Sequence, residues 1–301
     1  MTKMLVFTEF GGPETQEIVD RELPAPKGSQ VAIEVKAAGV NPADWKIRAG
    51  QMGDHWKLPA PMGREAAGIV TVIGDDVEDF AVGDEVLGLA AKGHGTFAEH
   101  TVLNANQTVA KPDELSFADA AALPVAGGTA YDVTHQIELE VGQTMVILGA
   151  GGGVGLMAAQ IGKVHQFNVI GIASASKRQL IEATGATFVE SGDGAADRVR
   201  AIASDGADLV IDLVGGQALR EIAPVAKEPS LIVSTADPDT AEELGGAGVQ
   251  RTKEGLAKIT EVAEYGLVTP NVAERFALQD VEQAIATVED GHAAGKVVIE
   301  P

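Results

Sequence analysis

The feature that most constrains the fold is a glycine-rich turn between a short apolar run and a helical pattern. Residues 145–148 read as a buried strand, and Gly149-Ala-Gly-Gly-Gly-Val-Gly155 follows at once, leading into a helical pattern that ends near residue 165. Further strand patterns occupy 168–173, 187–190, 208–212 and 230–233, and helical patterns occupy 177–184, 195–203 and 218–226. This alternation predicts right-handed βαβ units and a doubly wound parallel sheet with helices on both faces.

The same glycines suit a phosphate ligand. A missing side chain lets the backbone approach a pyrophosphate, and a helix N-terminus offers free N–H groups and a positive dipole. The spacing of Gly149, Gly152 and Gly155 differs from the strict G-x-G-x-x-G fingerprint but meets the same requirement. A flexible turn without a ligand is the alternative. Because the turn joins a strand to a helix, we expect Gly149, Gly152, Gly153, Val154 and Gly155 to bind a dinucleotide.

The end of the second predicted strand indicates which dinucleotide binds. An Asp or Glu at this place hydrogen-bonds the ribose 2′-OH of NAD(H). The chain instead has Ser174, Ser176, Lys177 and Arg178, whose hydroxyls and cations suit a 2′-phosphate. An ordinary helix start with Ser176 as N-cap is the alternative. We therefore expect NADP(H) rather than NAD(H).

The first 120 residues have a different pattern, in which short strands follow one another without helices between them. Residues 31–36 alternate as a half-buried strand does, residues 68–74 are more uniformly apolar, and residues 85–89 form another strand pattern. Short strands at this spacing predict a compact antiparallel barrel. Near the end, a helical pattern at 278–289 precedes a strand at 296–300 that is more similar to this first part than to the second.

Composition excludes several classes of function. Lys plus Arg is 22 and Asp plus Glu is 44, so the formal net charge is −22, and we expect no nucleic acid and no anionic membrane as partner. The absence of cysteine excludes disulfides, thiolate metal sites and a cysteine nucleophile. The N-terminal apolar run ends too early for a signal peptide, and glycines interrupt the uncharged window 144–162, so we expect a cytoplasmic protein.

These features together resemble the medium-chain dehydrogenase/reductase superfamily, and most closely its zinc-independent, quinone-oxidoreductase-like branch. Motifs in the expected order extend the resemblance along nearly the whole chain, at residues 38–50, 61–68, 83–86, 95–99, 121–130 and 291–296. The resemblance implies a GroES-like β-barrel catalytic domain at 1–121 and 267–301. It also implies a Rossmann NADP(H)-binding domain at 122–266, with a cofactor cleft between the two.

Two departures from relatives bear on function. Zinc-dependent relatives place a Cys and a Gly-His-Glu at the catalytic metal, where this chain has Asn41 and Arg64, and an arginine cannot ligate zinc. His94 and His100 are separated by about 20 Å if the chain is extended, so we expect no metal. Relatives also pair a long edge strand across a dimer axis, whereas residues 235–253 offer Pro, acidic residues and Gly. We expect a homodimer, if one forms, to be weakened.

Without zinc, the feasible reaction is hydride transfer from NADPH to a small electron-poor acceptor, a quinone or an α,β-unsaturated carbonyl. Candidate hydrogen-bond donors to the acceptor oxygen are Asn41, Lys46 and Arg64, and Asp44 is a candidate to orient one of them. A structural ion pair between Arg64 and Glu65 is the alternative for Arg64. The competing functions are a 2-alkenal or enone reductase and a noncatalytic NADPH-binding sensor.

Further residues are assigned by resemblance or by type. The resemblance places Thr129 near the nicotinamide and implies that Lys296 contacts cofactor phosphate; a solvated strand end is the alternative for Lys296. Trp45, Trp56 and Met52 are candidates for a flat apolar wall, and the two tryptophans are equally candidates for the barrel core.

Overall fold

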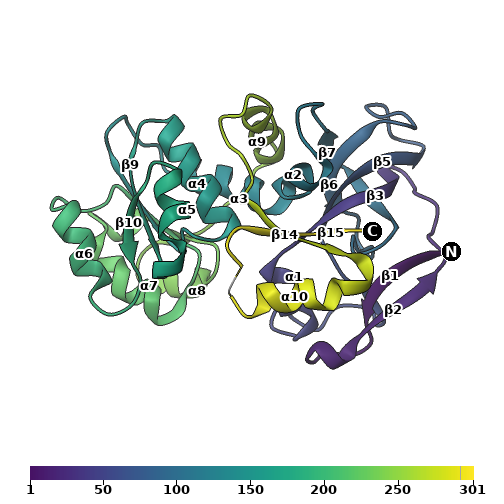
Figure 1. Cartoon of the computed structure of the whole chain (residues 1–301), viewed down its shortest axis with the longest axis horizontal. Coiled ribbons are helices and arrows are strands. Elements are labelled where there is room, and N and C mark those ends of the chain that lie inside the picture. The colour runs from purple at the N-terminus through teal and green to yellow at the C-terminus, as the bar shows by residue number, and fades with distance from the viewer. Residues whose placement is uncertain (292) are drawn as a thin grey trace. The chain divides into compact units, whose positions relative to one another are not determined.

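The computed structural model describes residues 1–291 and 293–301. The chain forms two compact units, Met1–Val125 with Asn271–Pro301, and Ala126–Pro270 (Figure 1). The domain boundaries that we predicted at 121/122 and 266/267 stay a prediction. His292, which belongs to the 291–296 motif, lies outside the described residues.

The first unit is built on a closed ring of antiparallel strands. Strands β3 (Gln30–Val40), β5 (Glu65–Ile73), β6 (Glu85–Ala90) and β7 (His100–Ala110) pair in that order, and β7 pairs again with β3. This ring confirms the predicted antiparallel barrel.

The last strand, β15 (Lys296–Glu300), adds to the barrel by pairing antiparallel with β3. It belongs with the first part of the chain, as predicted. Beyond it lies β14 (Val272–Ala277), parallel to β15, which the sequence analysis missed because Glu274 and Arg275 interrupt its apolar pattern.

The barrel core follows from alternation along its strands. Val31, Ile33 and Val35 on β3 are buried in one apolar cluster, whereas Glu34 and Lys36 between and beside them are partly exposed. Around the barrel lie β1 (Thr2–Phe7), β2 (Gln16–Arg21), β4 (Ala60–Pro61), α1 (Pro42–Arg48), α2 (Phe117–Ala121) and α10 (Val281–Glu289). Of these, β2, β1 and β4 form a separate three-stranded sheet.

The second unit is a parallel sheet with the Rossmann strand order. The strands are β8 (Thr144–Leu148), β9 (Asn168–Ala173), β10 (Thr187–Glu190), β11 (Leu209–Asp212), β12 (Ile232–Ser234) and β13 (Ala247–Gly248). In space their order is β10-β9-β8-β11-β12-β13, all parallel, which is the 3-2-1-4-5-6 order of a dinucleotide-binding domain. The predicted α/β class is thereby confirmed.

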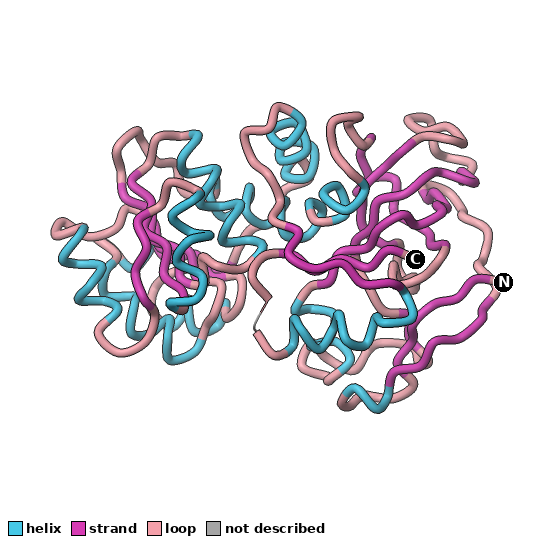
Figure 2. The backbone as a smooth tube through the Cα atoms, viewed as in Figure 1, coloured by secondary structure: helices cyan, strands magenta, loops and turns pink. Residues whose placement is uncertain are grey.

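Helices flank this sheet (Figure 2). They include α4 (Gly153–Val164), α5 (Arg178–Ala183), α6 (Ala195–Ile202), α7 (Gly216–Ile222) and α8 (Pro238–Glu243). Helix α3 (Gly128–His135) packs on α4, and α9 (Gly255–Glu264) packs on α3. The predicted helix at 177–184 is a 3₁₀ turn, Ala175–Lys177, followed by α5, so Ser176 lies inside the turn and does not cap α5. The edge strand β13 has two residues, and the expectation of a weakened homodimer stays a prediction.

Candidate functional site

The glycine turn joins β8 to α4, as the sequence predicts. Gly149 has φ of +90°, in the region that favours glycine. The first helical hydrogen bond runs from the Leu156 N–H to the Gly152 carbonyl at 2.9 Å. The N–H groups of Gly153, Val154 and Gly155 therefore precede the helical ladder and are available to an anion.

Two glycines of this turn differ in what surrounds them. A Cβ on Gly155 would lie 2.6 Å from both Ala150 Cα and the Gly149 carbonyl oxygen, so this glycine lets α4 start directly against the turn. A Cβ on Gly152 would meet nothing nearer than 3.7 Å. Gly155 is therefore required by the fold, whereas the space beside Gly152 is open for a ligand.

Lys177 lies on the glycine turn. A Cβ on Gly151 would be 2.3 Å from Lys177 Cδ, so the aliphatic part of the lysine packs where a side chain is missing. Burial lowers the pKa of Lys177 from its ordinary value. The structure thus brings together the turn and the first of the two predicted cations.

The rest of the predicted 2′-phosphate site follows β9. The hydroxyl oxygens of Ser174 and Ser176 are 3.1 Å apart, and both residues are exposed. The Arg178 guanidinium carbon lies 4.5 Å from the centre of the Phe188 ring, and Arg178 forms an exposed ion pair with Glu182 at 3.4 Å. Two hydroxyls and two cations are therefore grouped at the carboxyl end of β9, next to the turn.

The last residue of β11, Asp212, is a buried carboxylate that the sequence analysis did not assign to the site. Asp212 is fully buried; its Oδ1 accepts the N–H groups of Val214 and Gly215, and its Oδ2 accepts the hydroxyl of Ser234 at 2.5 Å. A Cβ on Gly149 would lie 3.0 Å from Val214 Cγ2, so the Asp212 loop is in contact with the glycine turn. The signal was available, because Asp212 ends a strand at the carboxyl edge of a parallel sheet.

Thr129, predicted by resemblance to lie near the nicotinamide, is on α3 and almost fully buried. Its hydroxyl accepts a hydrogen bond from the Arg251 guanidinium. The next residue, Thr252, donates its hydroxyl to Asp132 Oδ1 at 2.6 Å. The segment that contains Arg251 is thereby fixed to α3, and sequence reasoning did not single out that arginine.

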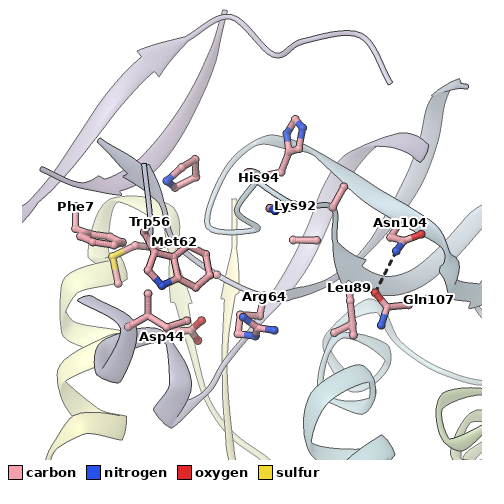
Figure 3. Close-up of a pocket in the computed structure, with 16 residues that line it drawn as sticks. Phe7, Asp44, Trp56, Met62, Arg64, Leu89, Lys92, His94, Asn104 and Gln107 are labelled. Carbon is pink, nitrogen blue, oxygen red and sulfur yellow. Dashed lines mark hydrogen bonds between the residues drawn. The ribbon is translucent and has the colours of Figure 1, made fainter. Parts of the chain in front are cut away.

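The first unit contains a pocket of about 320 Å³ (Figure 3). Phe7, Trp56 and Met62 form apolar walls, and Trp56 is the one predicted wall residue that lines it. Met52, also predicted, is 49% exposed and does not line it. The polar lining residues are Asp44, Arg64, Lys92, His94, Asn104 and Gln107.

A buried network of charged groups lies in the same unit. Lys296 Nζ is 2.7 Å from Glu65 Oε1, 2.8 Å from Asn41 Oδ1 and 3.0 Å from the Val40 carbonyl oxygen. The Asn41 amide donates to Glu65 Oε1 at 2.7 Å, and the Val125 N–H donates to Oε2 at 2.6 Å. Glu65 is fully buried and Lys296 is 4% exposed. Each charge is therefore paired and hydrogen-bonded, as buried charges must be.

This network contradicts two of the alternatives raised by the sequence, a solvated Lys296 and an Arg64–Glu65 ion pair. Lys296 is not a solvated strand end, because its ammonium is buried among three oxygens. Glu65 pairs with Lys296 and not with Arg64. The roles predicted for Asn41 in catalysis and for Lys296 at cofactor phosphate stay predictions; in this structure the Asn41 amide already donates to Glu65 and to the Gly39 carbonyl.

Asp44 is held at the first turn of α1. Its Oδ2 accepts the Asn41 N–H at 2.8 Å, whereas its Oδ1 is buried and has no hydrogen-bond partner among the described residues. Burial raises the pKa of Asp44 to about 7, although the Asn41 N–H and the Arg64 charge both favour the ionised form. Figure 3 shows the carboxyl on the side of the pocket where the Arg64 guanidinium lies.

The other two predicted donors differ in position. Arg64 lines the pocket, is exposed, and has no ion pair within the described ranges. Lys46 does not line the pocket; its Nζ lies 5.8 Å from the centre of the Trp45 ring. The structure thus joins Asp44 and Arg64 in one pocket and leaves Lys46 outside it.

A Rossmann sheet with an open glycine turn, together with a barrel that carries an amphipathic pocket, is the architecture of many dinucleotide-dependent oxidoreductases. Residues 27–113 match the alcohol dehydrogenase GroES-like domain, and residues 184–299 match a domain described as a zinc-binding dehydrogenase. The chain belongs to the medium-chain dehydrogenase/reductase superfamily and to its quinone-oxidoreductase-like branch.

Individual relatives extend over nearly the whole chain. Quinone oxidoreductase of Homo sapiens is 30% identical over 97% of this chain and 95% of its own length. A chloroplastic NADPH-dependent alkenal/one oxidoreductase of Arabidopsis thaliana is 30% identical over 99% of this chain and 79% of its own. Among solved structures, the quinone oxidoreductase of Coxiella burnetii superposes with a TM-score of 0.90 at 29% identity, covering 100% of this chain and 99% of that chain.

Residues 1–291 and 293–301 contain no group of three or more His, Cys, Asp or Glu side chains that could hold a metal ion. In the same ranges, no helix is long and apolar enough to cross a membrane.

Proposed function

We propose that the protein is an NADPH-dependent reductase that transfers a hydride to quinones or α,β-unsaturated carbonyls. The observation that carries this proposal is the packing of Lys177 on Gly151, which sets a cation beside the glycine turn of a Rossmann sheet. The names of two relatives support it: the human protein is a quinone oxidoreductase, and the Arabidopsis protein is an NADPH-dependent alkenal/one oxidoreductase.

The residues of the second unit fit NADP(H). The amides of Gly153, Val154 and Gly155 suit the pyrophosphate, with open space beside Gly152. Ser174, Ser176, Lys177 and Arg178 suit the 2′-phosphate, because hydroxyls and cations form charge-assisted hydrogen bonds to it. When bound, NADPH supplies the hydride. The resemblance also implies that Thr129 lies near the nicotinamide and that Lys296 contacts cofactor phosphate. For the second contact the Lys296 ammonium would have to leave the three buried oxygens to which it is bonded.

The pocket of the first unit is the proposed site of the acceptor. Its aromatic and thioether walls, Phe7, Trp56 and Met62, exclude water from a flat apolar molecule. Arg64 donates hydrogen bonds to the acceptor oxygen on which negative charge develops, and so stabilises that charge. This is the role of an oxyanion hole, performed by one side chain.

We propose further that the reaction needs no zinc. Arg64 stands where zinc-dependent relatives have a histidine ligand, and the chain has no cysteine. Its donor set therefore does not fit a catalytic zinc ion. We expect turnover to survive dialysis against a chelator; loss of activity that added zinc restores would contradict this.

Two expectations complete the proposal. The protein acts in the cytoplasm on a small molecule, and any homodimer is weak because the edge strand β13 has only Ala247–Gly248 to pair. Sedimentation over a range of protein concentrations tests the second expectation, since a dimer that persists at nanomolar concentration would contradict it.

Loss of NADPH absorbance, followed with a panel of quinones and a panel of enones, tests the function itself. We expect turnover on members of at least one panel, and the comparison of panels separates a quinone reductase from a 2-alkenal or enone reductase. Tight NADPH binding without turnover on either panel would instead support the noncatalytic sensor.

A further inference from the structure

Among the described residues that line the acceptor pocket, two have a buried polar atom without a hydrogen-bond partner: Trp56 at its indole nitrogen and Asp44 at its carboxyl. Of these two groups, the carboxyl of Asp44 is the ionisable one. The residue is 3% exposed, and it lines the pocket together with Trp56 and Arg64. Its Oδ2 is held at 2.8 Å by the Asn41 N–H, which fixes the carboxyl at the start of α1. Its Oδ1 is buried without a partner in the described part of the chain.

An unbonded carboxylate oxygen at such a place is costly. Burying an ionised carboxylate with one oxygen unsatisfied is among the largest penalties in a protein interior, whereas a protonated carboxyl carries no charge and has an O–H to donate. The geometry thus favours a carboxylic acid on a residue that lines the pocket.

The charges around Asp44 influence whether its carboxyl is protonated or ionised. Arg64 lines the same pocket and favours the carboxylate, as does Lys296 of the buried network, whereas Glu65 disfavours it. Lys92 and His94 also line the pocket, and burial lowers the pKa of His94 below its usual value. With burial as the largest effect, the pKa of Asp44 is raised to about 7, so both forms are populated near neutral pH.

We propose that Asp44 is the general acid that protonates the acceptor during reduction. This inference rests on the proposed function, and it assigns the residue a different role from the orienting one predicted by its sequence position. For an enone, hydride from NADPH forms a C–H bond at the β-carbon, and the π electrons move onto the carbonyl oxygen, which Arg64 stabilises. The Asp44 O–H bond breaks as its proton passes to the α-carbon of the resulting enolate, where a C–H bond forms and the carbonyl is restored. The carboxylate that remains takes up a proton from water before the next turnover.

The matched variant is Asp44→Asn, which keeps the shape of the side chain and an oxygen for the Asn41 N–H but has no proton to transfer. We expect kcat to fall about 10²-fold or more, the usual effect of losing a general acid. In the unsubstituted protein kcat falls as the pH rises through about 7, because the acid form is lost; in Asp44→Asn this step is absent. The expected NADPH dissociation constant is unchanged.

Asp54→Asn is the control. Asp54 is an exposed carboxylate that follows α1 and does not line the pocket, so its loss leaves kcat and its pH dependence unchanged. An Asp44→Asn protein that binds NADPH, melts cooperatively and keeps both the rate and the pH step would overturn the proposal and make Asp44 a structural residue.

A second measurement needs neither cofactor nor acceptor. Infrared difference spectra between pH 6 and pH 8 are expected to show the carbonyl band of a buried protonated carboxylic acid that disappears at the higher pH and is missing from Asp44→Asn. Absence of that band in the unsubstituted protein would contradict the proposal even if turnover is observed. If the band is present but no acceptor is reduced, the proposed function fails while the protonation of Asp44 stands.

Discussion

The ammonium of Lys296 and the carboxylate of Glu65 form a buried ion pair, with 2.7 Å between Nζ and Oε1. The pair connects the last strand of the chain to β5, across a separation of 231 residues. It lies in the first unit, next to Asn41. A cation that the protein itself supplies is thus bound among the oxygens of this region.

Removal of one partner of this pair is expected to be costly. Lys296→Met leaves a buried, uncompensated carboxylate, so the free energy of unfolding should fall by about 3–5 kcal/mol. Denaturant unfolding followed by circular dichroism measures this loss. The control is Glu300→Gln, which breaks the exposed ion pair between Glu300, on the same strand as Lys296, and Arg275 on β14; it should cost less than about 1 kcal/mol. An equal fall in the free energy of unfolding of the two variants would show that the buried Lys296–Glu65 pair contributes no more to stability than an exposed pair.

The raised pKa of Asp44 also predicts how stability depends on pH. A carboxyl whose pKa is higher in the folded than in the unfolded chain keeps its proton on folding between about pH 4 and 7, so the free energy of unfolding falls as the pH rises through this range. Asp44→Asn has no carboxylate, so it removes the cost of burying an ionised group above pH 7. We expect it to raise stability at pH 8, by on the order of 4 kcal/mol at the upper limit, and to change it little at pH 4.

Thermal melts of both proteins at the two pH values measure this difference. Asp54→Asn, which alters an exposed carboxylate, should show no such dependence on pH. A melting temperature of Asp44→Asn that lies equally far from the unsubstituted protein at both pH values would contradict a raised pKa.

The glycine turn gives a prediction that separates folding from binding. Gly155→Ala brings a Cβ to 2.6 Å from backbone atoms of residues 149 and 150, so we expect it to lower the melting temperature by several degrees. Gly152→Ala has room for its Cβ, so it should fold normally but weaken NADPH binding at least 10-fold by occupying the space of the pyrophosphate. Unchanged NADPH affinity in Gly152→Ala would place the phosphates elsewhere.

Arg64 gives a prediction about the acceptor. Arg64→Leu removes the proposed donor to the acceptor oxygen, and we expect kcat/KM to fall about 10²-fold, as for the loss of an oxyanion donor. Because Arg64 lacks an ion pair within the described residues, stability should change little. Arg200→Leu, on an exposed helix of the other unit, is the control for charge. Full activity of Arg64→Leu would contradict the proposed role of Arg64 as a donor to the acceptor oxygen.

The cofactor preference rests on the basic group after β9. Lys177→Glu together with Arg178→Glu replaces two cations by carboxylates that repel a 2′-phosphate. We expect NADPH binding to weaken by at least 10²-fold and NADH binding to change by less than 10-fold, since NADH has no 2′-phosphate. Fluorescence titration with both cofactors measures this, and an equal effect on both would refute the assignment.

Local sequence patterns were sufficient to predict most strands and helices of the fold. The strand at 168–173 and the turn at 149–155 are found where they were predicted, because hydrophobic runs and glycine clusters act over a few residues. The strand predicted at 230–233 lies at Ile232–Ser234, because Pro229 starts a 3₁₀ turn that includes Leu231. The alternation of strands and helices predicted the parallel sheet through the βαβ rule, but no local pattern indicated the order of its strands.

The site was less accessible to prediction, because its contacts join residues far apart in the chain. The Glu65–Lys296 pair spans 231 residues and the Thr129–Arg251 hydrogen bond spans 122. No local pattern indicates that Glu65 turns away from Arg64, its neighbour. Likewise the motif that contains Asp44 suggests a polar loop, and only the packing of Trp56 and the barrel around it shows the carboxyl to be buried.

Calorimetric titration of the purified protein with NADPH, and separately with NADH, tests the account most directly. The structure predicts saturable, one-to-one binding of NADPH, tighter than that of NADH, since the glycine turn and the Ser174–Arg178 group act on the same ligand. A protein that folds normally and yet releases no heat of binding with either cofactor would contradict the assignment of the second unit, and with it the proposed reductase.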